Sequence, residues 1–455
     1  MRLTFHGAVR TVTGSLHQVE VGGSLLYLDC GLYQGRRAEA YDRNRRFPST
    51  HRDVEAVILS HAHLDHCGNL PTLVAGGFRG PIYCTPATRD LAALVLRDSA
   101  KVQRQDLRIV NKIRQRQGLL KAEVLYDLRA AERAISQMVT MPYGQRFRVG
   151  SSTATFFDAG HILGSAMVLL EGDGRRLGFS GDLGRSGSAI IRDPAVLPAV
   201  DMLLIESTYG DRAHPPRAEA HARLAAVVTE TTRRGGRVLI PAFALARTQQ
   251  ILYALRQHRE TGLVPDVPIY VDSPMAINAT AIYRRHPDCY DDETRARLKL
   301  RDPFGFKAAR YVRAHTDSQA LVDSDEPCVV IATSGMAEGG RIREHLRRRI
   351  EDPRSTILFV GYQAEHTLGR RLVDGMPEVR IYGEPYHVRI RVERVDAFSA
   401  HADRNELLAW ARRVPEIGRA FCVHGDEAPA TAFAQALSEV RVKASVPTVG
   451  QSEAV

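Results

Sequence analysis

Short apolar runs alternate with polar and glycine-containing stretches along most of the chain, and this rhythm predicts a mixed α/β protein. The first 30 residues alternate apolar and polar positions, as strands with one buried face do. Mostly apolar runs then recur and end abruptly at polar residues, which indicates short buried strands. We expect such strands at 25–28, 54–59, 155–157, 177–179, 202–205 and 420–423.

A second series of elements occupies the middle of the chain. The runs 238–241, 269–272 and 328–332 predict buried parallel strands, and amphipathic stretches at 248–257 and 341–350 predict helices between or after them. A strand, a crossover and another strand in succession predict a doubly wound sheet.

Two further regions have simpler patterns. The region from Leu91 to about Gln137 is rich in Arg, Gln, Ala and Leu. It predicts helices that lie on the first series of elements, either at a substrate entrance or at an oligomer contact, with a homodimer as the expected oligomer. The last residues, 450–455, are expected to form a frayed end.

Side chains that suit metal binding follow several apolar runs where each strand ends. The segment His61-Ala-His63-Leu-Asp65-His66 places three imidazoles and a carboxylate directly after the run 54–59. Strand ends meet at one edge of a sheet, so dispersed ligands can build one site there. Imidazole and carboxylate suit zinc best, although a solvated His-rich loop is the alternative for this segment taken alone. Other strand-end residues of this kind are Asp29, His161, Asp182 and His424.

The number of donors favours two metal ions. Seven donors exceed what one tetrahedral ion takes and suit a close pair of ions. Asp29 is left over; we expect it to orient a ligating imidazole, and the alternative is a turn residue before Gly31. We expect His61, His63 and His161 to form one three-imidazole face, Asp65, His66 and His424 to form a second, and Asp182 to bridge two zinc ions.

The motif HAHLDH, together with the dispersed ligands, resembles the metallo-β-lactamase fold family. That resemblance implies a four-layer αββα sandwich with a dinuclear site at one edge of its two sheets. Further motifs resemble the β-CASP branch of this fold, whose members process RNA or DNA. These motifs are Glu206-Ser-Thr-Tyr-Gly210, Pro241-Ala-Phe-Ala-Leu-Ala-Arg247, Val271-Asp-Ser-Pro-Met275, Ser334-Gly335-Met336 and Ser399-Ala-His401-Ala-Asp403.

The resemblance covers almost the whole chain and implies its domain organisation. A chain of 455 residues suits two or three domains. Because His424 lies far from the other ligands, an insertion must interrupt the metal domain. We expect the metallo-β-lactamase domain at 1–207 and 376–455, and an inserted β-CASP α/β domain at 208–375.

The resemblance also implies an activity. In the β-CASP branch, Glu206 matches motif A, His401 motif B and His424 motif C, and a His at motif C is typical of RNA-directed members. The chain resembles the short bacterial β-CASP ribonucleases, which are related to the polyadenylation-factor nuclease subunit. It departs from the branch at His366, where Gly is common. We therefore expect zinc-dependent hydrolysis of RNA phosphodiester bonds, as a 5′-to-3′ exonuclease, an endonuclease or both.

Three residues are expected to act in catalysis. His401 is the expected acid that protonates the leaving 3′-oxygen, Glu206 is expected to favour its charged form, and Asp65 acts beside the metals. The alternative is that His401 starts a helix and Glu206 is a cap.

The formal net charge of +10 favours a polyanionic partner, and we expect single-stranded RNA. Backbone N–H groups at Ser334 and Gly335, with the side chains of Arg247 and Arg370, are expected to bind it. For any single Arg of the insertion, a solvated helix face is the alternative.

The sequence also indicates a compartment and leaves two rival functions. It lacks a secretory segment and any apolar run near the ~20 residues that span a bilayer. Six scattered cysteines fit the reducing cytoplasm, where we expect the protein and no membrane association. A small-molecule hydrolase would share HAHLDH but does not need the long insertion or the positive charge. A non-catalytic scaffold is expected to have lost ligands.

Overall fold

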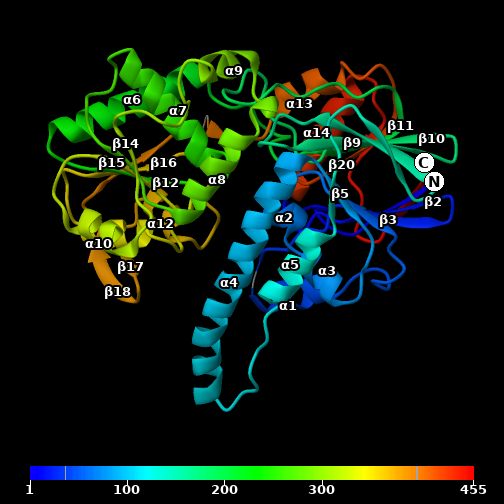
Figure 1. Cartoon of the computed structure of the whole chain (residues 1–455), viewed down its shortest axis with the longest axis horizontal. Helices are drawn as coiled ribbons and strands as arrows, with labels where there is room; N and C mark the ends of the chain where they lie inside the picture. The colour runs from blue at the N-terminus through cyan, green and yellow to red at the C-terminus, as the bar shows by residue number, and fades with distance from the viewer. Residues whose placement is uncertain (36, 396–397) are drawn as a thin grey trace. The chain divides into compact units, whose positions relative to one another are not determined.

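The computed structural model describes residues 1–35, 37–395 and 398–455, which form two compact units (Figure 1). Unit 1 comprises Met1–Ser188, Arg192–Ala213 and His401–Val455. Unit 2 comprises Ala189–Ile191 and His214–Ala400.

Unit 1 contains two mixed sheets. The first consists, in spatial order, of β22 (Ser452–Ala454), β1 (Arg2–Phe5), β2 (His17–Val21), β3 (Ser24–Leu28), β4 (Ala56–Ile58), β5 (Ile82–Cys84) and β6 (Met138–Thr140). Strands β22 to β3 pair antiparallel, whereas β3 to β6 run parallel. The expected frayed end at 450–455 is wrong, because β22 pairs with β1 in the register Leu3↔Glu453.

The second sheet of unit 1 has the same division into an antiparallel and a parallel half. It consists, in spatial order, of β21 (Ala444–Ser445), β20 (Ile417–Val423), β11 (Val200–Glu206), β10 (Arg175–Phe179), β9 (Ala166–Gly172), β8 (Ser152–Asp158) and β7 (Arg146–Val149). Strands β10, β11, β20 and β21 are parallel, and β7 to β10 are antiparallel. Strand β20, late in the chain, thus joins β11, so sequence-distant strand ends share one sheet edge.

A single apolar core fills the space between these two sheets. Leu26 and Ile58 from the first sheet and Val168 and Leu204 from the second are completely buried in it. The rings of Phe5 and Phe421 meet across the sheets with centroids 4.8 Å apart. Because burying one such side chain contributes about 1.5–3 kcal/mol, this core stabilises the edge on which the strands end.

Helices cover the outer faces and complete the αββα sandwich that the sequence implied (Figure 1). The helices of unit 1 are α1 (Arg37–Arg45), α2 (Leu64–Cys67), α3 (Leu70–Ala75), α4 (Pro86–Arg116), α5 (Leu128–Ser136), α13 (Arg404–Ala411) and α14 (Glu427–Glu439). The apolar faces of α13 and α14 pack against the second sheet through Trp410, Phe433 and Leu437. The six cysteines of the chain are free and buried.

Unit 2 is built on a parallel sheet. Its strands are, in spatial order, β14 (Ala309–Tyr311), β13 (Ile269–Val271), β15 (Val329–Ala332), β12 (Val238–Pro241), β16 (Thr356–Phe359) and β19 (Arg391–Arg394). The described pairs are all parallel, and sequence neighbours are not always sheet neighbours, as the predicted crossovers require. A separate antiparallel hairpin joins β17 (Glu378–Ile381) to β18 (Glu384–His387).

Helices connect these strands. They are α6 (Arg217–Arg233), α7 (Arg247–Glu260), α8 (Pro274–Arg285), the 3-10 helix η1 (Pro287–Cys289), α9 (Asp292–Leu298), α10 (His315–Asp323), α11 (Ile342–Arg349) and α12 (Leu368–Val373). Helices α7 and α11 lie where the amphipathic patterns predicted them. Among the described residues, no helix is both long enough and apolar enough to cross a membrane.

The limits of unit 2 differ from the domain boundaries expected from the sequence. Those boundaries were 208 and 376, whereas the units change at His214 and His401. The physical reason is that β19 pairs with β16 in the sheet of unit 2. Residues 376–395 therefore pack with the insertion.

Candidate metal centre

Strand ends of the two sheets of unit 1 bring nine side chains together, and His401, which comes shortly before α13, joins them. Asp29 follows β3, the HAHLDH segment follows β4, and His161, Asp182, Glu206 and His424 follow β8, β10, β11 and β20. The side chains form three groups, in each of which one ligand atom per residue lies within 4.8 Å of the others. The groups are His61, His63, His161 and Asp182; Asp65, His66 and His424; and Asp182, Glu206 and His401.

The HAHLDH segment has a compact local structure. His63 is the N-cap residue of the one-turn helix α2, which carries Asp65 and His66. The backbone carbonyl of Asp65 accepts a hydrogen bond from the Ser15 N–H at 2.7 Å. A Cβ on Gly31 would lie 1.6 Å from that carbonyl oxygen, so only glycine lets the loop after β3 approach this closely.

Three imidazoles converge in the first group. His63 Nδ1 lies 3.0 Å from His61 Nε2 and 3.3 Å from His161 Nε2. Asp182 Oδ2 lies 3.4 Å from His61 Nε2 and 3.6 Å from His161 Nε2. Burial lowers the pKa of His63 to about 4 and the pKa values of His61 and His161 well below 6.5. These rings are therefore neutral at pH 7, with lone pairs available to a metal.

The second group faces the other oxygen of the same carboxylate. His66 Nε2 lies 3.1 Å from His424 Nε2 and 3.4 Å from Asp182 Oδ1, and Asp65 Oδ2 lies 3.5 Å from His424 Nε2. Burial would lower the pKa of His66, but the carboxylates of Asp182 and Asp29 outweigh it and raise the pKa well above 6.5. Burial would raise the pKa of Asp65, but hydrogen bonding to His424 and the charge of His66 lower it.

A set of hydrogen bonds holds these imidazoles from behind. Asp29 Oδ2 lies 2.6 Å from His66 Nδ1 and also accepts from the Ser60 hydroxyl at 3.0 Å. The Ser60 hydroxyl lies 3.1 Å from His61 Nδ1, and the Thr208 hydroxyl lies 3.1 Å from His424 Nδ1. Such contacts fix which ring nitrogen points into the cluster. Sequence reasoning expected Asp29 in this role but missed Ser60 and Thr208, because a Ser or Thr after a strand carries no specific signal.

The donor set fits metal cations. Nitrogen lone pairs that face one another at 3.0–3.3 Å repel unless a proton or a cation lies between them. Asp182 Oδ1 is buried and has no hydrogen-bond partner in the described part of the chain. An unsatisfied buried carboxylate oxygen is costly, and a cation would satisfy it. Imidazole nitrogen and carboxylate oxygen are the ligands that zinc takes.

An acid–base pair adjoins the cluster. Both oxygens of the fully buried Glu206 carboxylate lie 3.2 Å from His401 Nδ1, and the N–H of Leu183 donates to Glu206 Oε1 at 2.6 Å. The His401 side chain is 21% exposed. Burial would lower its pKa, but the charges of Glu206 and then Asp182 outweigh burial and raise the pKa to about 9. His401 therefore carries a proton at neutral pH, while its neighbour Asp403 caps α13 in a capping box.

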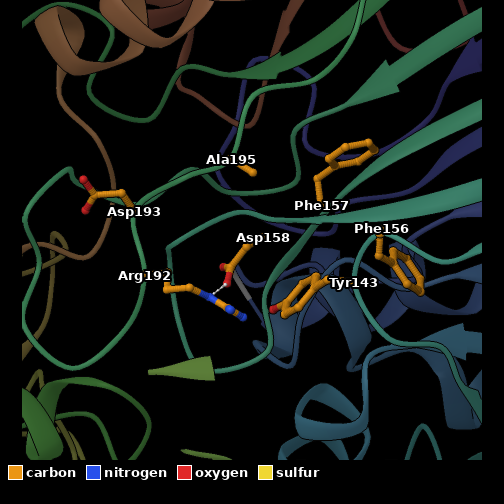
Figure 2. A pocket seen from close by; sticks show the side chains of 8 residues that line it. Tyr143, Phe156, Phe157, Asp158, Arg192, Asp193 and Ala195 are labelled. Atoms are coloured by element: carbon orange, nitrogen blue, oxygen red, sulfur yellow. Dashed lines mark hydrogen bonds and ion pairs between the residues drawn. The ribbon is translucent and has the colours of Figure 1, made fainter. Parts of the chain in front are cut away.

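A cavity of about 290 Å³ in unit 1 is lined by the end of β8 and by residues of the segments 143–144 and 192–195 (Figure 2). Figure 2 shows the side chains of Arg192 and Asp158, which both line it, pointing toward one another, with an Nε–Oδ2 distance of 3.1 Å. Asp158 Oδ1 accepts from the Gly160 N–H at 3.0 Å. Burial raises the pKa of Asp158 to about 6, although Gly160 and Arg192 lower it. The sequence did not predict this cavity. Asp158, which lines it, holds the backbone at Gly160, next to His161.

The four expected substrate-binding residues lie in unit 2. Ser334 Oγ accepts hydrogen bonds from the N–H groups of Glu338 and Gly339, so this hydroxyl shapes its own loop. A Cβ on Gly335 would lie 2.9 Å from the Phe243 ring. Arg247 begins α7, and Arg370 forms an ion pair with Asp374 at 2.9 Å.

His366 has a backbone conformation that residues other than glycine rarely adopt. Its φ is 67°, in the left-handed region that favours glycine, and its side chain is exposed. The departure from Gly at this position therefore costs backbone strain.

Comparison with known proteins gives three family matches. Residues 26–242 match the Beta-lactamase superfamily domain, residues 248–372 the Beta-Casp domain, and residues 385–447 the Zn-dependent metallo-hydrolase RNA specificity domain.

Similar proteins come from a bacterium and an archaeon. The chain is 39% identical over 440 residues to Ribonuclease TTHA0252 of Thermus thermophilus, which covers 96% of both chains. It is 32% identical to the RNase J-like protein of Methanocaldococcus jannaschii, covering 98% of both. It is 34% identical to Transcription termination factor FttA of the same archaeon, covering 95% of this chain and 68% of that one.

One solved structure, a protein of unknown function from Enterococcus faecalis V583, aligns over 100% of this chain and 99% of its own. Its TM-score is 0.56 at 13% sequence identity. This match supports the fold alone.

Proposed function

This chain belongs to the β-CASP family of the metallo-β-lactamase fold, and we propose that it is a two-zinc ribonuclease that acts on single-stranded RNA. RNA hydrolysis agrees with the 39% identity to a ribonuclease over 96% of both chains. The observation that carries the two-metal proposal is the placement of Asp182. One of its oxygens faces His61 and His161, and the other faces His66.

The proposed ligands divide between two ions. When bound, zinc supplies Lewis-acid charge for the phosphodiester and activates water at neutral pH. Asp29, Ser60 and Thr208 keep the ligating nitrogens oriented toward the ions. His61, His63 and His161 would hold one ion, Asp65, His66 and His424 the other, and Asp182 would contact both.

His401 is the proposed general acid. The departing 3′-oxygen needs a proton, and His401 holds one at neutral pH because Glu206 lies 3.2 Å from its Nδ1. With Nδ1 occupied by Glu206, Nε2 is the atom that gives up the proton. Glu206 is itself fixed by the Leu183 N–H, so the imidazole is held in one orientation. The side chain of Asp65 acts through the metal that it would bind.

The deciding experiment is digestion of end-labelled single-stranded RNA. Substrates with a 5′-phosphate and a 5′-hydroxyl are compared, and fragment lengths are followed over time. Stepwise release from a 5′-phosphorylated end indicates a 5′-to-3′ exonuclease, whereas internal fragments from both substrates indicate an endonuclease. Elemental analysis of the same preparation should give two zinc ions per chain.

The rival functions give different results in parallel assays. A small-molecule hydrolase would hydrolyse nitrocefin or S-lactoylglutathione and leave RNA intact. A scaffold would bind RNA without cutting it. Uncut RNA together with turnover of a small substrate contradicts the proposal.

A further inference from the structure

Helix α4 is much longer than its packing requires. It has 31 residues and therefore runs for about 46 Å. Its first half packs in unit 1 through buried residues such as Ala92 and Leu96. Figure 1 shows the second half projecting away from the rest of unit 1. A projecting helix loses the tertiary packing that normally stabilises helices. The projecting half is therefore expected to have a functional role.

The first turn of α4 is hydrogen-bonded to a loop of the candidate metal centre. Thr85 is its N-cap residue, and the hydroxyls of Thr85 and Thr88 donate to the carbonyl oxygen of Gly164 at 2.7 Å and 2.8 Å. Gly164 belongs to the short loop between β8 and β9, which also carries His161. The two threonines therefore connect the base of α4 directly to a loop that carries a proposed metal ligand.

One face of the projecting half is covered by the chain that returns along it. The Asn111 side chain accepts from the Ala122 N–H at 2.8 Å and donates to its carbonyl at 3.1 Å. The Leu125 N–H donates to Gln103 Oε1 at 3.2 Å. These bonds hold the helix and the segment 119–126 together as one arm of unit 1.

A row of cations runs along a different face of the arm. Their spacing of three, four, four and four residues places all of them within about 120° of the helix circumference, at 100° per residue. The row spans 15 residues, or about 22 Å. All five side chains are exposed, and among the described residues the carboxylate whose pKa the row affects is Asp98, which lies one turn before Lys101. The row consists of Lys101, Arg104, Arg108, Lys112 and Arg116.

This row costs helix stability when nothing binds to it. Like charges three or four residues apart destabilise a helix by about 0.2–0.5 kcal/mol per pair. Helices of unit 2 pair their arginines instead, as Arg347 does with Glu344 and Arg370 with Asp374. In the first half of α4, Arg97 likewise pairs with Glu132, so the row in the second half stands out and points to a polyanion as its counter-charge.

We propose that the cation row of α4 is a second binding surface for the RNA substrate, which holds the strand at a distance from the metal centre. The inference rests on the proposed RNA hydrolysis. A single row of cations complements a row of phosphates. A membrane surface fits less well, because it requires a continuous exposed apolar face. The described side chains of α4 offer only Val102 and Ile113 as exposed large apolar groups, and segment 119–126 covers another part of the helix. A second copy of the arm would bring like charges together.

The geometry sets a length requirement. Lys101 is 16 residues beyond Thr85, or about 24 Å along the helix. A stacked strand advances about 3.4 Å per nucleotide, so a bound strand needs about seven nucleotides to reach the row. Short RNAs therefore contact only the metal centre, whereas longer RNAs also contact the cation row of the arm.

The test compares two fourfold variants with equal net charge. The arm variant is Arg104→Gln, Arg108→Gln, Lys112→Gln and Arg116→Gln. The control variant is Arg79→Gln, Arg412→Gln, Arg413→Gln and Lys443→Gln, which removes exposed cations elsewhere in unit 1. Fluorescence anisotropy with uncleavable 2′-O-methyl RNAs of 5 and 30 nucleotides gives affinity as a function of salt. A charge-conserving arm variant, in which the arginines become Lys and Lys112 becomes Arg, separates charge from shape.

The arm variant should bind the 30-nucleotide RNA at least tenfold more weakly than the wild type at ~0.1 M salt. In a plot of log affinity against log salt concentration, the magnitude of its slope should fall by about 3, because each lost phosphate contact removes ~0.7. The control variant, the charge-conserving variant and all binding of the 5-nucleotide RNA should match the wild type. Unchanged binding and slope in the arm variant overturn the inference. So does loss of binding to phosphatidylserine vesicles, or loss of a dimer in sedimentation, with RNA binding unchanged. Failure of the wild type to cut RNA that it binds would instead contradict the proposed function.

Discussion

Replacing Glu206 with Gln should shift the pH dependence of RNA cleavage toward acid. The substitution keeps the side-chain volume and the acceptor for the Leu183 N–H, but removes the charge 3.2 Å from His401 Nδ1. That charge is the largest influence that raises the pKa of His401, against burial. A raised pKa keeps the imidazole protonated until the pH passes it, so acid catalysis is lost only on the alkaline side.

The size of the shift follows from the structure. The pKa of His401 is about 9, against an ordinary value of 6.5. This difference in pKa corresponds to about 3 kcal/mol, because one pKa unit is worth about 1.36 kcal/mol. If the variant returns to about 6.5, the protonated fraction at about pH 7.5 falls from ~97% to ~9%, and kcat falls about tenfold. Zinc bound to Asp182 would weaken the contribution of that carboxylate to the raised pKa of His401. The alkaline limb of the wild-type pH profile therefore lies at or below about pH 9, and E206Q still moves it toward acid.

The assay is kcat for a 30-nucleotide RNA between pH 5.5 and pH 9.5 with zinc present throughout. Glu416→Gln, which removes an exposed carboxylate of unit 1, is the matched control. The ratio of wild-type to E206Q rates should be near one at the acid end and rise to about tenfold near pH 7.5. Alkaline limbs that coincide in the two proteins would refute the assignment of His401 as an acid tuned by Glu206.

Three further results are expected. His401→Ala should lower kcat by about 10²-fold or more and leave the zinc content at two, whereas His63→Ala should lose zinc; a loss of metal in both would place His401 among the ligands. Zinc binding near pH 7 should release about one proton, because His66 must give up the proton that Asp182 and Asp29 stabilise. Calorimetry in buffers of different ionisation enthalpy measures this release, and a buffer-independent enthalpy contradicts it. Gly31→Ala should lower both Tm and zinc affinity, because the new Cβ would lie 1.6 Å from the Asp65 carbonyl oxygen; zinc titration and thermal melting that match the wild type would contradict this.

The meeting of the metal-site residues could be anticipated from the sequence because each follows a recognisable apolar strand. His424 comes directly after such a run and Asp182 shortly after one, and parallel pairing of β10, β11 and β20 brings them to one edge. The orientation of the rings could not be anticipated. It depends on the hydroxyls of Ser60 and Thr208, and these residues are common after strands for many other reasons.

Parts of the fold escaped prediction where the side chains carry little pattern. Strand β22 is Ser-Glu-Ala and β19 is Arg-Val-Glu-Arg, so neither shows the apolar run that marks a buried strand. Backbone pairing with β1 and β16, rather than hydrophobicity, determines their place. For that reason the chain end was expected to fray, and the insertion was expected to end near residue 375.

The pairing of β20 with β11 has a consequence for biosynthesis. A growing polypeptide has already exposed the HAHLDH loop, His161 and Asp182 long before His424 leaves the ribosome, and His401 arrives only shortly earlier. An unfinished chain thus lacks both the acid and one side of the cluster. The proposed activity therefore requires the segment that carries His401 and His424, so a chain truncated before residue 401 should not cut RNA.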